Sequence, residues 1–286
     1  VNAKAGDYRL HKLSACVGAG ASDEDTPAVD KNGVARTSSD IGAYTMVKVE
    51  NVYYVSTEGS DDAAGTQDAP FRTIAKAVSV LRAGEKVIVM DGEYTENLSI
   101  IKSYDEADSF VISAQNAGKV TVNGNVAIVD SSNVTVSGIN VNNTAGNAAV
   151  VVNNSTGIKL DSASVSAASG NGIQAADSEL TLSEMKILVP GVGLTGSASV
   201  MKVTRTLFKG NTKAISSEEA SDLLVTASVF STCGSGIYSV GESALQVINN
   251  SFWNVSGLNV DVTQQDGSDT ELNLYNNAYS RSGSAD

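Results

Sequence analysis

The sequence contains few of the side chains on which most enzymes and metal proteins depend. It has one histidine, His11, and two cysteines, Cys16 and Cys233, among 286 residues. Two cysteines are too few for a disulfide framework and lack metal-ligand spacing, so we expect free, buried thiols, with a single bridge as the alternative. Serine–histidine and histidine–metal chemistry are disfavoured, because His11 stands apart from the repeated part of the chain.

Basic residues and long apolar runs are also scarce. Nineteen Lys and Arg residues stand against thirty-two Asp and Glu, and the net charge of −13 repels phosphate backbones and anionic lipid surfaces. No run approaches the roughly 18 apolar residues that span a bilayer, and Val1 does not open a signal sequence. We therefore expect a soluble chain with no nucleic-acid partner and no membrane insertion, whose export signal, if any, has been removed or lies upstream.

The sequence does contain a repeat. An eight-residue pattern, here called the octad, carries apolar or small residues at positions 1, 3, 6 and 8 and recurs seven times, at starts 21 to 27 residues apart. The octads read VTVSGINV from Val134, IKLDSASV from Ile158, LTLSEMKI from Leu180, MKVTRTLF from Met201, LLVTASVF from Leu223, LQVINNSF from Leu245 and LNLYNNAY from Leu272. A period near 22 that tolerates insertions is typical of a solenoid with one turn per repeat.

The octad predicts how each turn of the solenoid is built. The step from position 1 to position 3 is strand alternation, whereas position 6 points inward again only if the chain turns a corner after position 3. Position 8 should stack into an axial core column of Val141, Val165, Ile187, Phe208, Phe230, Phe252 and Tyr279. A second apolar register should supply the next strand, at Val150, Ile173, Leu194, Ile215, Ile237 and Val260. Roughly ten coils spaced ~4.8 Å apart would give a rod about 50 Å long.

The sequence predicts two further local features. Residues 70–83 carry apolar side chains at helical spacing and end at Gly84, which predicts a helix that caps the first coil. If the register holds, Asn249 and Asn250 stack over Asn276 and Asn277, where their side-chain amides can bond along the axis. Ordinary loop asparagines are the alternative.

The first part of this region resembles a known superfamily. The motifs Tyr53–Asp62, Gly65-Thr66, Ala69–Ile74 and Val87–Tyr94 are similar to the opening of secreted pectin-lyase-like proteins. The resemblance implies an all-β, right-handed parallel β-helix with a short N-terminal capping helix, over residues 51–286. That superfamily is rich in polysaccharide lyases and glycoside hydrolases and also includes adhesins, so the fold does not decide the activity.

Residues 7–44 resemble a second kind of segment. Asp7–Leu10, Ser14–Gly20, Asp30–Arg36 and Asp40–Tyr44 look like the choice-of-anchor (type Q) segment that closes many bacterial β-helix surface proteins. That segment normally comes last, whereas here it comes first, so we treat residues 1–50 as a closing segment. Asp30, Arg36 and Asp40 are expected to hold it together.

The displaced segment suggests a head-to-tail arrangement. If one copy of the chain follows another directly, Tyr8-Arg9-Leu10 falls one coil after Leu272, and the period of the solenoid is kept. We expect a tandem unit or a protomer that contacts copies of itself. The alternative is a fragment that begins in the tail of a preceding domain.

Charged side chains at the outward octad positions form the one candidate catalytic patch. Three consecutive coils should place six charged residues on one face: Lys159, Asp161, Glu184, Lys186, Lys202 and Arg205. The resemblance to polysaccharide lyases makes them worth testing, because β-elimination on a uronate needs cations and a Lys or Arg base. Salt bridges between coils are the competing interpretation.

Other candidate sites are weaker. The acidic clusters Asp23-Glu24-Asp25, Asp61-Asp62 and Asp105-Glu106-Asp108 offer oxygen ligands for Ca²⁺, but they lack the spacing of a calcium loop, and no other cofactor is indicated. Trp253 and Tyr238 could stack on sugar rings. The sequence therefore favours a non-catalytic, extracellular or cell-surface structural repeat module, or a protomer, of a bacterial surface protein or filament. A polysaccharide lyase or glycoside hydrolase acting on acidic glycans and a glycan-binding adhesin stalk, which would contact cell-surface polysaccharide, are the alternatives.

Overall fold

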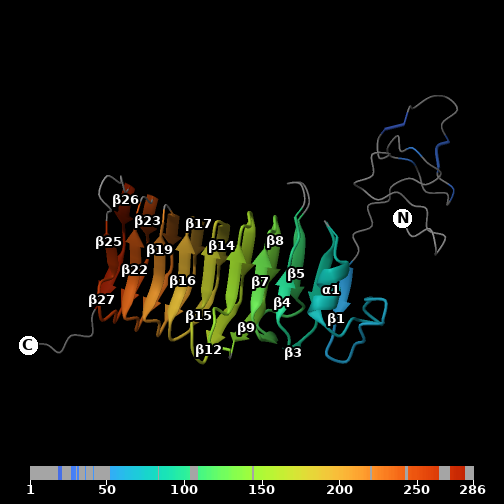
Figure 1. Ribbon diagram of the computed structural model, residues 1–286, viewed down its shortest axis with the longest axis horizontal. Coiled ribbons are helices and arrows are strands. Elements are labelled where there is room, and N and C mark those ends of the chain that lie inside the picture. The colour runs from blue at the N-terminus through green and yellow to red at the C-terminus, as the bar shows by residue number, and fades with distance from the viewer. Residues whose placement is uncertain are drawn as a thin grey trace, which may run out of the picture. The chain divides into compact units, whose positions relative to one another are not determined.

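The computed structural model describes residues 19–20, 27–29, 31, 36, 41, 52–82, 84–103, 109–143, 145–219, 221–241, 244–263 and 271–280. The chain divides into two units, Val1–Glu50 and Asn51–Asp286. Every described helix and strand with a label lies in the second unit, which is considered by itself below. It is a parallel β-solenoid, as predicted, in which each coil passes through three sheets (Figure 1).

Sheet 1 holds the first half of each octad, and all its strands are parallel. Its spatial order is β1 (Val52–Val55), β2 (Lys86–Val89), β5 (Phe110–Ala114), β8 (Val134–Ser137), β11 (Ile158–Asp161), β14 (Glu179–Ser183), β17 (Val200–Thr204), β20 (Asp222–Thr226), β23 (Ala244–Ile248) and β26 (Glu271–Tyr275).

Sheet 2 holds the second half of each octad, and most of its strands are shorter. In spatial order they are β3 (Gly92–Tyr94), β6 (Val120–Asn123), β9 (Ile139–Asn143), β12 (Ser164–Ala167), β15 (Lys186–Leu188), β18 (Leu207–Lys209), β21 (Val229–Ser231), β24 (Ser251–Trp253) and β27 (Ala278–Ser280).

Sheet 3 is built from the second apolar register. Its strands are β4 (Leu98–Ile100), β7 (Val126–Val129), β10 (Val150–Asn153), β13 (Ile173–Ala176), β16 (Val192–Ser197), β19 (Lys213–Glu218), β22 (Ser235–Val240) and β25 (Val260–Thr263). The predicted register is confirmed, because Val150 pairs with Ile173, and Ile237 with Val260, across neighbouring coils.

The predicted corner lies at octad position 5, between sheets 1 and 2. Seven successive coils place a residue with positive φ there, and six of the seven are not glycine: Gly138, Ser162, Glu184, Arg205, Ala227, Asn249 and Asn276. A single left-handed residue reverses the strand alternation, so that position 6 faces inward. Such a backbone costs of order 1 kcal/mol or more in a non-glycine residue, and the surrounding structure must offset this cost.

A ladder of hydrogen bonds at octad position 6 supports that corner. The backbone N–H of Thr206 donates to Ser228 Oγ at 3.1 Å, and that of Ser228 donates to Asn250 Oδ1 at 2.8 Å. The backbone N–H of Asn250 then donates to Asn277 Oδ1 at 2.9 Å, and its side-chain amide reaches the same oxygen at 3.2 Å. The predicted axial bonding is thus confirmed for Asn250 and Asn277.

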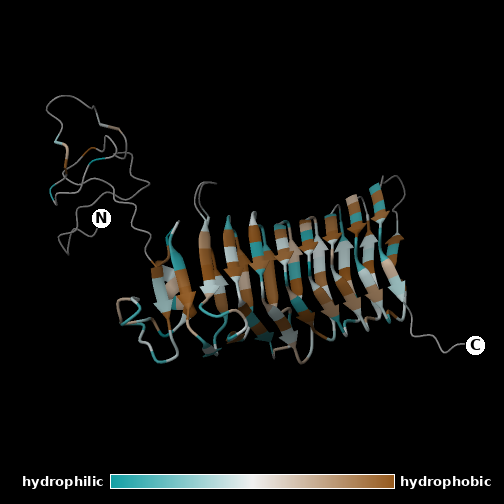
Figure 2. Cartoon of the chain, turned by 180° about the vertical axis from the view of Figure 1, so that it is seen from behind, coloured by the Kyte–Doolittle hydropathy of each residue, from teal (hydrophilic) through white to brown (hydrophobic). Residues whose placement is uncertain are grey.

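The core is the axial column at octad position 8. Phe208 pairs with Phe230, Phe230 with Phe252 and Phe252 with Tyr279 in register, and the rings stack on one another. The three phenylalanines are at most 1 % exposed. Figure 2 shows the matching alternation of hydrophobic and hydrophilic residues along the strands. The column is what the octad predicted.

The capping helix is present but shorter than the predicted residues 70–83. Helix α1 spans Ile74–Val80 and contacts β1, β2 and β4. It starts late because Phe71 forms a bridge with Val55, and because Thr73 is the N-cap, whose hydroxyl accepts from Lys76 N. It ends at Leu81, where the backbone becomes extended.

Candidate functional site

The six patch residues do not share one face, so this part of the sequence interpretation is wrong. Lys159 and Lys202 lie on the outer face of sheet 1, on β11 and β17, with Thr181 between them in the same column. Lys186 lies on β15 in sheet 2. The left-handed corner separates octad positions 2 and 7 onto different sheets, which simple outward alternation does not reveal.

Two of the remaining members, Arg205 and Glu184, are paired at the corner, and the third, Asp161, has other partners. Arg205 Nε lies 3.1 Å from Glu184 Oε1, and Arg205 Nη2 donates to Ser183 Oγ at 3.1 Å. Asp161 accepts hydrogen bonds from Ser162 and from Ser137 in the preceding coil, at 2.9 and 3.3 Å. The salt-bridge interpretation therefore holds for the Arg205–Glu184 pair. Because both side chains are more than half exposed, the pair adds only about 0–1 kcal/mol to stability.

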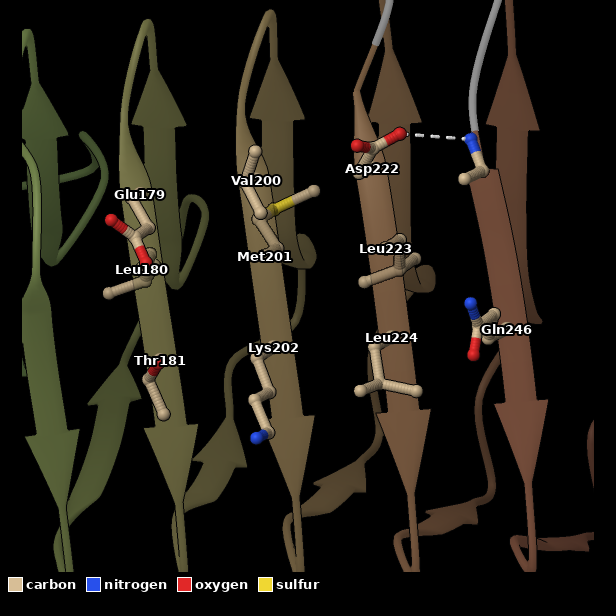
Figure 3. A pocket seen from close by; sticks show the side chains of 11 residues that line it. Glu179, Leu180, Thr181, Val200, Met201, Lys202, Asp222, Leu223, Leu224 and Gln246 are labelled. Atoms are coloured by element: carbon tan, nitrogen blue, oxygen red, sulfur yellow. Dashed lines mark hydrogen bonds between the residues drawn. The ribbon is translucent and has the colours of Figure 1, made fainter.

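A pocket lies on the outer face of sheet 1, over β14, β17, β20 and β23. Its volume is about 260 Å³. Leu180, Met201 and Leu223 border it from the core side, and the outward residues that line it are Glu179, Thr181, Val200, Lys202, Asp222, Leu224, Ala244 and Gln246 (Figure 3). The centre is apolar, since Val200 is 53 % exposed and Leu224 lies diagonally beside it in the next strand.

Polar groups surround that apolar centre. The side chain of Lys202 has no hydrogen bond or ion pair with any described residue. Glu179 and Asp222 stand two coils apart, with Val200 between them. Asp222 Oδ1 accepts from Ala244 N at 3.1 Å, which fixes its carboxylate at the edge of the pocket. An ammonium, two carboxylates and an amide around an apolar patch can bind a ligand that has hydroxyl groups, an apolar face and one negative charge.

The sequence pointed to only one residue of this pocket, Lys202. Glu179, Val200 and Asp222 immediately precede octads, and Leu224 and Gln246 stand at octad position 2. An apolar residue at an outward position, such as Leu224, is the signal that could have located the pocket.

The two aromatic candidates lie elsewhere. Tyr238 is on β22 in sheet 3, and Lys213 Nζ lies 4.0 Å from the centre of its ring, so a cation–π contact already occupies one ring face. Trp253 lies on β24 in sheet 2 and is 58 % exposed. They do not form a common site with each other or with the pocket.

Some of the candidate metal ligands lie among the described residues, and the others lie outside them. Asp61 is used locally, because its carboxylate accepts from the backbone N–H groups of Arg72 and Thr73 and from the Thr73 hydroxyl. The clusters at 23–25 and 105–108 lie outside the described residues, as do His11, Cys16, Asp30 and Asp40. Within the described ranges, no three His, Cys, Asp or Glu side chains gather as a metal site would require.

Cys233 is a free thiol inside the solenoid. Burial raises its pKa, although hydrogen bonds with the surroundings partly oppose this shift. The thiol therefore stays protonated and contributes packing rather than nucleophilic chemistry.

Among the described residues, no helix is long and apolar enough to cross a membrane.

Comparison with protein families agrees with this architecture. The family model described as "Right handed beta helix region" matches residues 124–279, and the model "Protein of unknown function (DUF1565)" matches residues 57–99. The pectate lyase PEL9 of Emericella nidulans is 41% identical over 73 residues, which make up 25% of this chain and 18% of that enzyme. The matched stretch thus spans about a fifth of that relative.

Two solved structures share the fold at low identity. Carrot pectin methylesterase has a TM-score of 0.53 and 13% identity, covering 84% of this chain and 86% of that one. The family 28 exopolygalacturonase of Yersinia enterocolitica has a TM-score of 0.52 and 11% identity, covering 90% and 70%. At these identities the likeness establishes the fold alone. The resemblance of residues 7–44 to a closing segment stays a prediction.

Proposed function

Since this chain belongs to the right-handed β-helix family, whose model covers more than half of it, we propose that it is an extracellular module that binds a uronate-containing polysaccharide without cleaving it. The observation that carries the proposal is the pocket on the outer face of sheet 1, where Lys202 is unpaired among the described residues. In this pocket Lys202 pairs with a uronate carboxylate, and Glu179, Asp222 and Gln246 accept or donate hydrogen bonds to hydroxyls.

The pocket chemistry and one relative support this class of ligand. The apolar patch of Val200 and Leu224 suits the C–H face of a sugar ring, which a fully charged site would not. The pectate lyase that shares 41% identity over 73 residues is named for a galacturonate polymer, so oligogalacturonate is the first ligand to test. Such polymers lie outside the plasma membrane, which is why we place the module there.

The state of the basic groups supports binding without cleavage. β-Elimination needs a base positioned against the substrate, together with cations that neutralise its carboxylate. Arg205 is held by Glu184 and Ser183, while Lys159 and Lys202 stand two coils apart, ~10 Å at the backbone. This arrangement supports recognition along the axis more than catalysis at one point.

The test is calorimetric titration of the full chain with oligogalacturonate, with a neutral oligoglucoside as the comparison ligand. Lys202→Ala should weaken oligogalacturonate binding by about tenfold or more, since a charge-assisted hydrogen bond contributes ~1.5–3 kcal/mol. Lys186→Ala removes the same charge from the outer face of sheet 2 and should leave affinity unchanged.

Four outcomes would contradict the proposal. Absence of binding, or equal losses in the two lysine variants, would remove the pocket as the binding site. Release of unsaturated uronide, seen by its ultraviolet absorbance, would identify a lyase. Hydrolysis that Glu179→Gln or Asp222→Asn abolishes would identify a glycoside hydrolase, because such enzymes use paired carboxylates.

A further inference from the structure

The outward side chains of sheet 1 form rows that run along the solenoid axis. Because neighbouring coils pair in register, the side chain at octad position 2 of each coil lies beside the same position of the next coil. From β11 to β23 this row, here called the axial row, reads Lys159, Thr181, Lys202, Leu224 and Gln246. Figure 3 shows its last four members in line across neighbouring strands, where they line the pocket. The row therefore continues beyond the pocket to Lys159.

The axial row carries positive charge in a chain whose net charge is −13. Both lysines are exposed, and the side chain of neither has a hydrogen bond or ion pair with any described residue. None of the five residues of the row is acidic. Glu179, in the neighbouring row of the pocket, accepts a hydrogen bond from the backbone N–H of Gly157 at 3.3 Å. Both ammonium groups are therefore available to an anionic ligand.

The distance between the two lysines suits alternate residues of a polyuronate. They stand two coils apart, ~10 Å at the backbone, with the neutral Thr181 between them. Each residue of an extended 1,4-linked chain of pyranoses advances that chain by a distance close to one strand spacing, and successive residues turn their carboxylates to opposite sides. Alternate carboxylates therefore face the same side, two strand spacings apart. A chain that lies along the axial row brings two such carboxylates to the two lysines together.

The other members of the row suit the rest of such a ligand. Thr181 lies beneath the middle sugar, whose carboxylate points away from the sheet, and its hydroxyl can donate or accept a hydrogen bond. On the other side of Lys202, Leu224 and the neighbouring Val200 offer an apolar surface to the C–H face of a ring. Gln246 follows with an amide that can bind hydroxyls. The row thus offers, in axial order, a cation, a hydroxyl, a cation, an apolar surface and an amide.

We propose that a polyuronate chain binds parallel to the solenoid axis along the axial row, with the carboxylates of two alternate residues on Lys202 and Lys159. Lys159 is thereby a second binding residue, one coil beyond the edge of the pocket. The inference rests on the proposed function, since it extends the glycan site at Lys202. It adds a required ligand length, because a disaccharide reaches only one lysine, whereas three sugar residues reach both.

The first experiment compares digalacturonate with trigalacturonate by calorimetric titration of the full chain. Lys159→Ala should lower the affinity for the trisaccharide by about threefold to fivefold, the value of one exposed ion pair, and leave disaccharide binding unchanged. Lys202→Ala should weaken the binding of both ligands. Lys186→Ala, on the outer face of sheet 2, is the matched control and should change neither. Trisaccharide binding that Lys159→Ala leaves intact would overturn the axial alignment.

The second experiment tests the spacing while the charge is held constant. The double variant Lys159→Thr/Thr181→Lys exchanges two neighbours of the axial row, so that the two lysines stand on adjacent coils, ~5 Å apart at the backbone. Its affinity for the trisaccharide should fall to that of Lys159→Ala, because adjacent carboxylates point to opposite sides. Full trisaccharide affinity in this variant would show that charge alone attracts the ligand, contrary to the proposal.

Failure of the glycan site itself gives a different result. If Lys202→Ala leaves the affinity for both oligomers unchanged, the pocket is not the binding site, and the proposed function and the axial alignment are both wrong. If Lys202→Ala weakens disaccharide binding while Lys159→Ala leaves trisaccharide binding intact, the glycan site stands and only the axial alignment is wrong. Unchanged disaccharide binding by Lys159→Ala also shows that this variant is folded.

Discussion

Phe230 and Phe252 stack with their ring centroids 4.5 Å apart and their planes inclined by only 6°. Phe208 continues the stack on the other side of Phe230 at 5.2 Å and 3°. These separations are close to the ~4.8 Å distance between neighbouring strands, so the sheet geometry itself sets the ring spacing. The hydrogen-bond ladder at octad position 6 and the aromatic column at octad position 8 therefore both repeat once per coil along the axis.

Removing the central ring tests that column. Phe230→Ala should lower the free energy of unfolding by ~3–5 kcal/mol, because it leaves a cavity between two rings that the coils cannot close. Val229→Ala, on the neighbouring residue whose side chain is 40 % exposed, should cost less than about 1 kcal/mol. Chemical denaturation of both variants provides the comparison. Equal losses would contradict the assigned core column.

The corner ladder gives a second prediction. Asn250→Ala removes the acceptor of Ser228 N and the donor to Val225 O in a buried turn, so stability should fall by about 1–3 kcal/mol. Asn249 is the neighbouring corner residue, with φ of 58°. Asn249→Gly should be neutral or slightly stabilising, because glycine adopts this backbone without strain. Thermal melts that reversed this order would show that the ladder does not support the corner.

Acid should weaken the helix cap through Asp61. Partial burial alone would raise the pKa of this carboxyl, but hydrogen bonds from Thr73 and Arg72 outweigh it and lower the pKa below its usual value. The folded protein therefore binds this proton less readily than the unfolded chain does. The stabilisation is complete above the unfolded pKa of about 4 and is lost as pH falls through the lower folded value.

Asp61→Asn should accordingly lower the melting temperature near neutral pH, and the difference from wild type should shrink below about pH 4. Asp62→Asn removes the same charge one residue away, where the carboxylate is not an acceptor in the cap, and should have a smaller effect. A pH-independent difference for Asp61→Asn would indicate that its ionised form is not what stabilises the cap.

The fold could be predicted because its determinants are local and repeated. Octad positions 1, 3 and 8 recur often enough to fix the register, and the Phe230 column followed directly from it. The length of α1 could not be predicted in the same way. Its start depends on Thr73, Asp61 and Glu96, whose carboxylate accepts from Ile74 N and Ala75 N at 2.9 Å, and Glu96 lies 22 residues away.

The site was harder to predict because outward residues leave no periodic signal. Lys159 and Lys186 differ only in octad position, yet a left-handed residue between the two halves of the octad sends them to different sheets. The pocket depends on which side chains are neighbours across strands, such as Lys202 beside Leu224. Such pairs become visible only when the register is known for every coil.

The length of the solenoid is proportional to its number of coils. Each period of 21 or 22 residues between neighbouring octads such as Leu180, Met201 and Leu223 advances the axis by one strand spacing, ~4.8 Å. Inserting or excising one such period would shift the distance between the two termini of the solenoid by that fixed increment while leaving the corners and the faces aligned. The distance between the two ends of the solenoid can therefore change by whole strand spacings when whole periods are added or removed, and the existing surfaces need no further substitution.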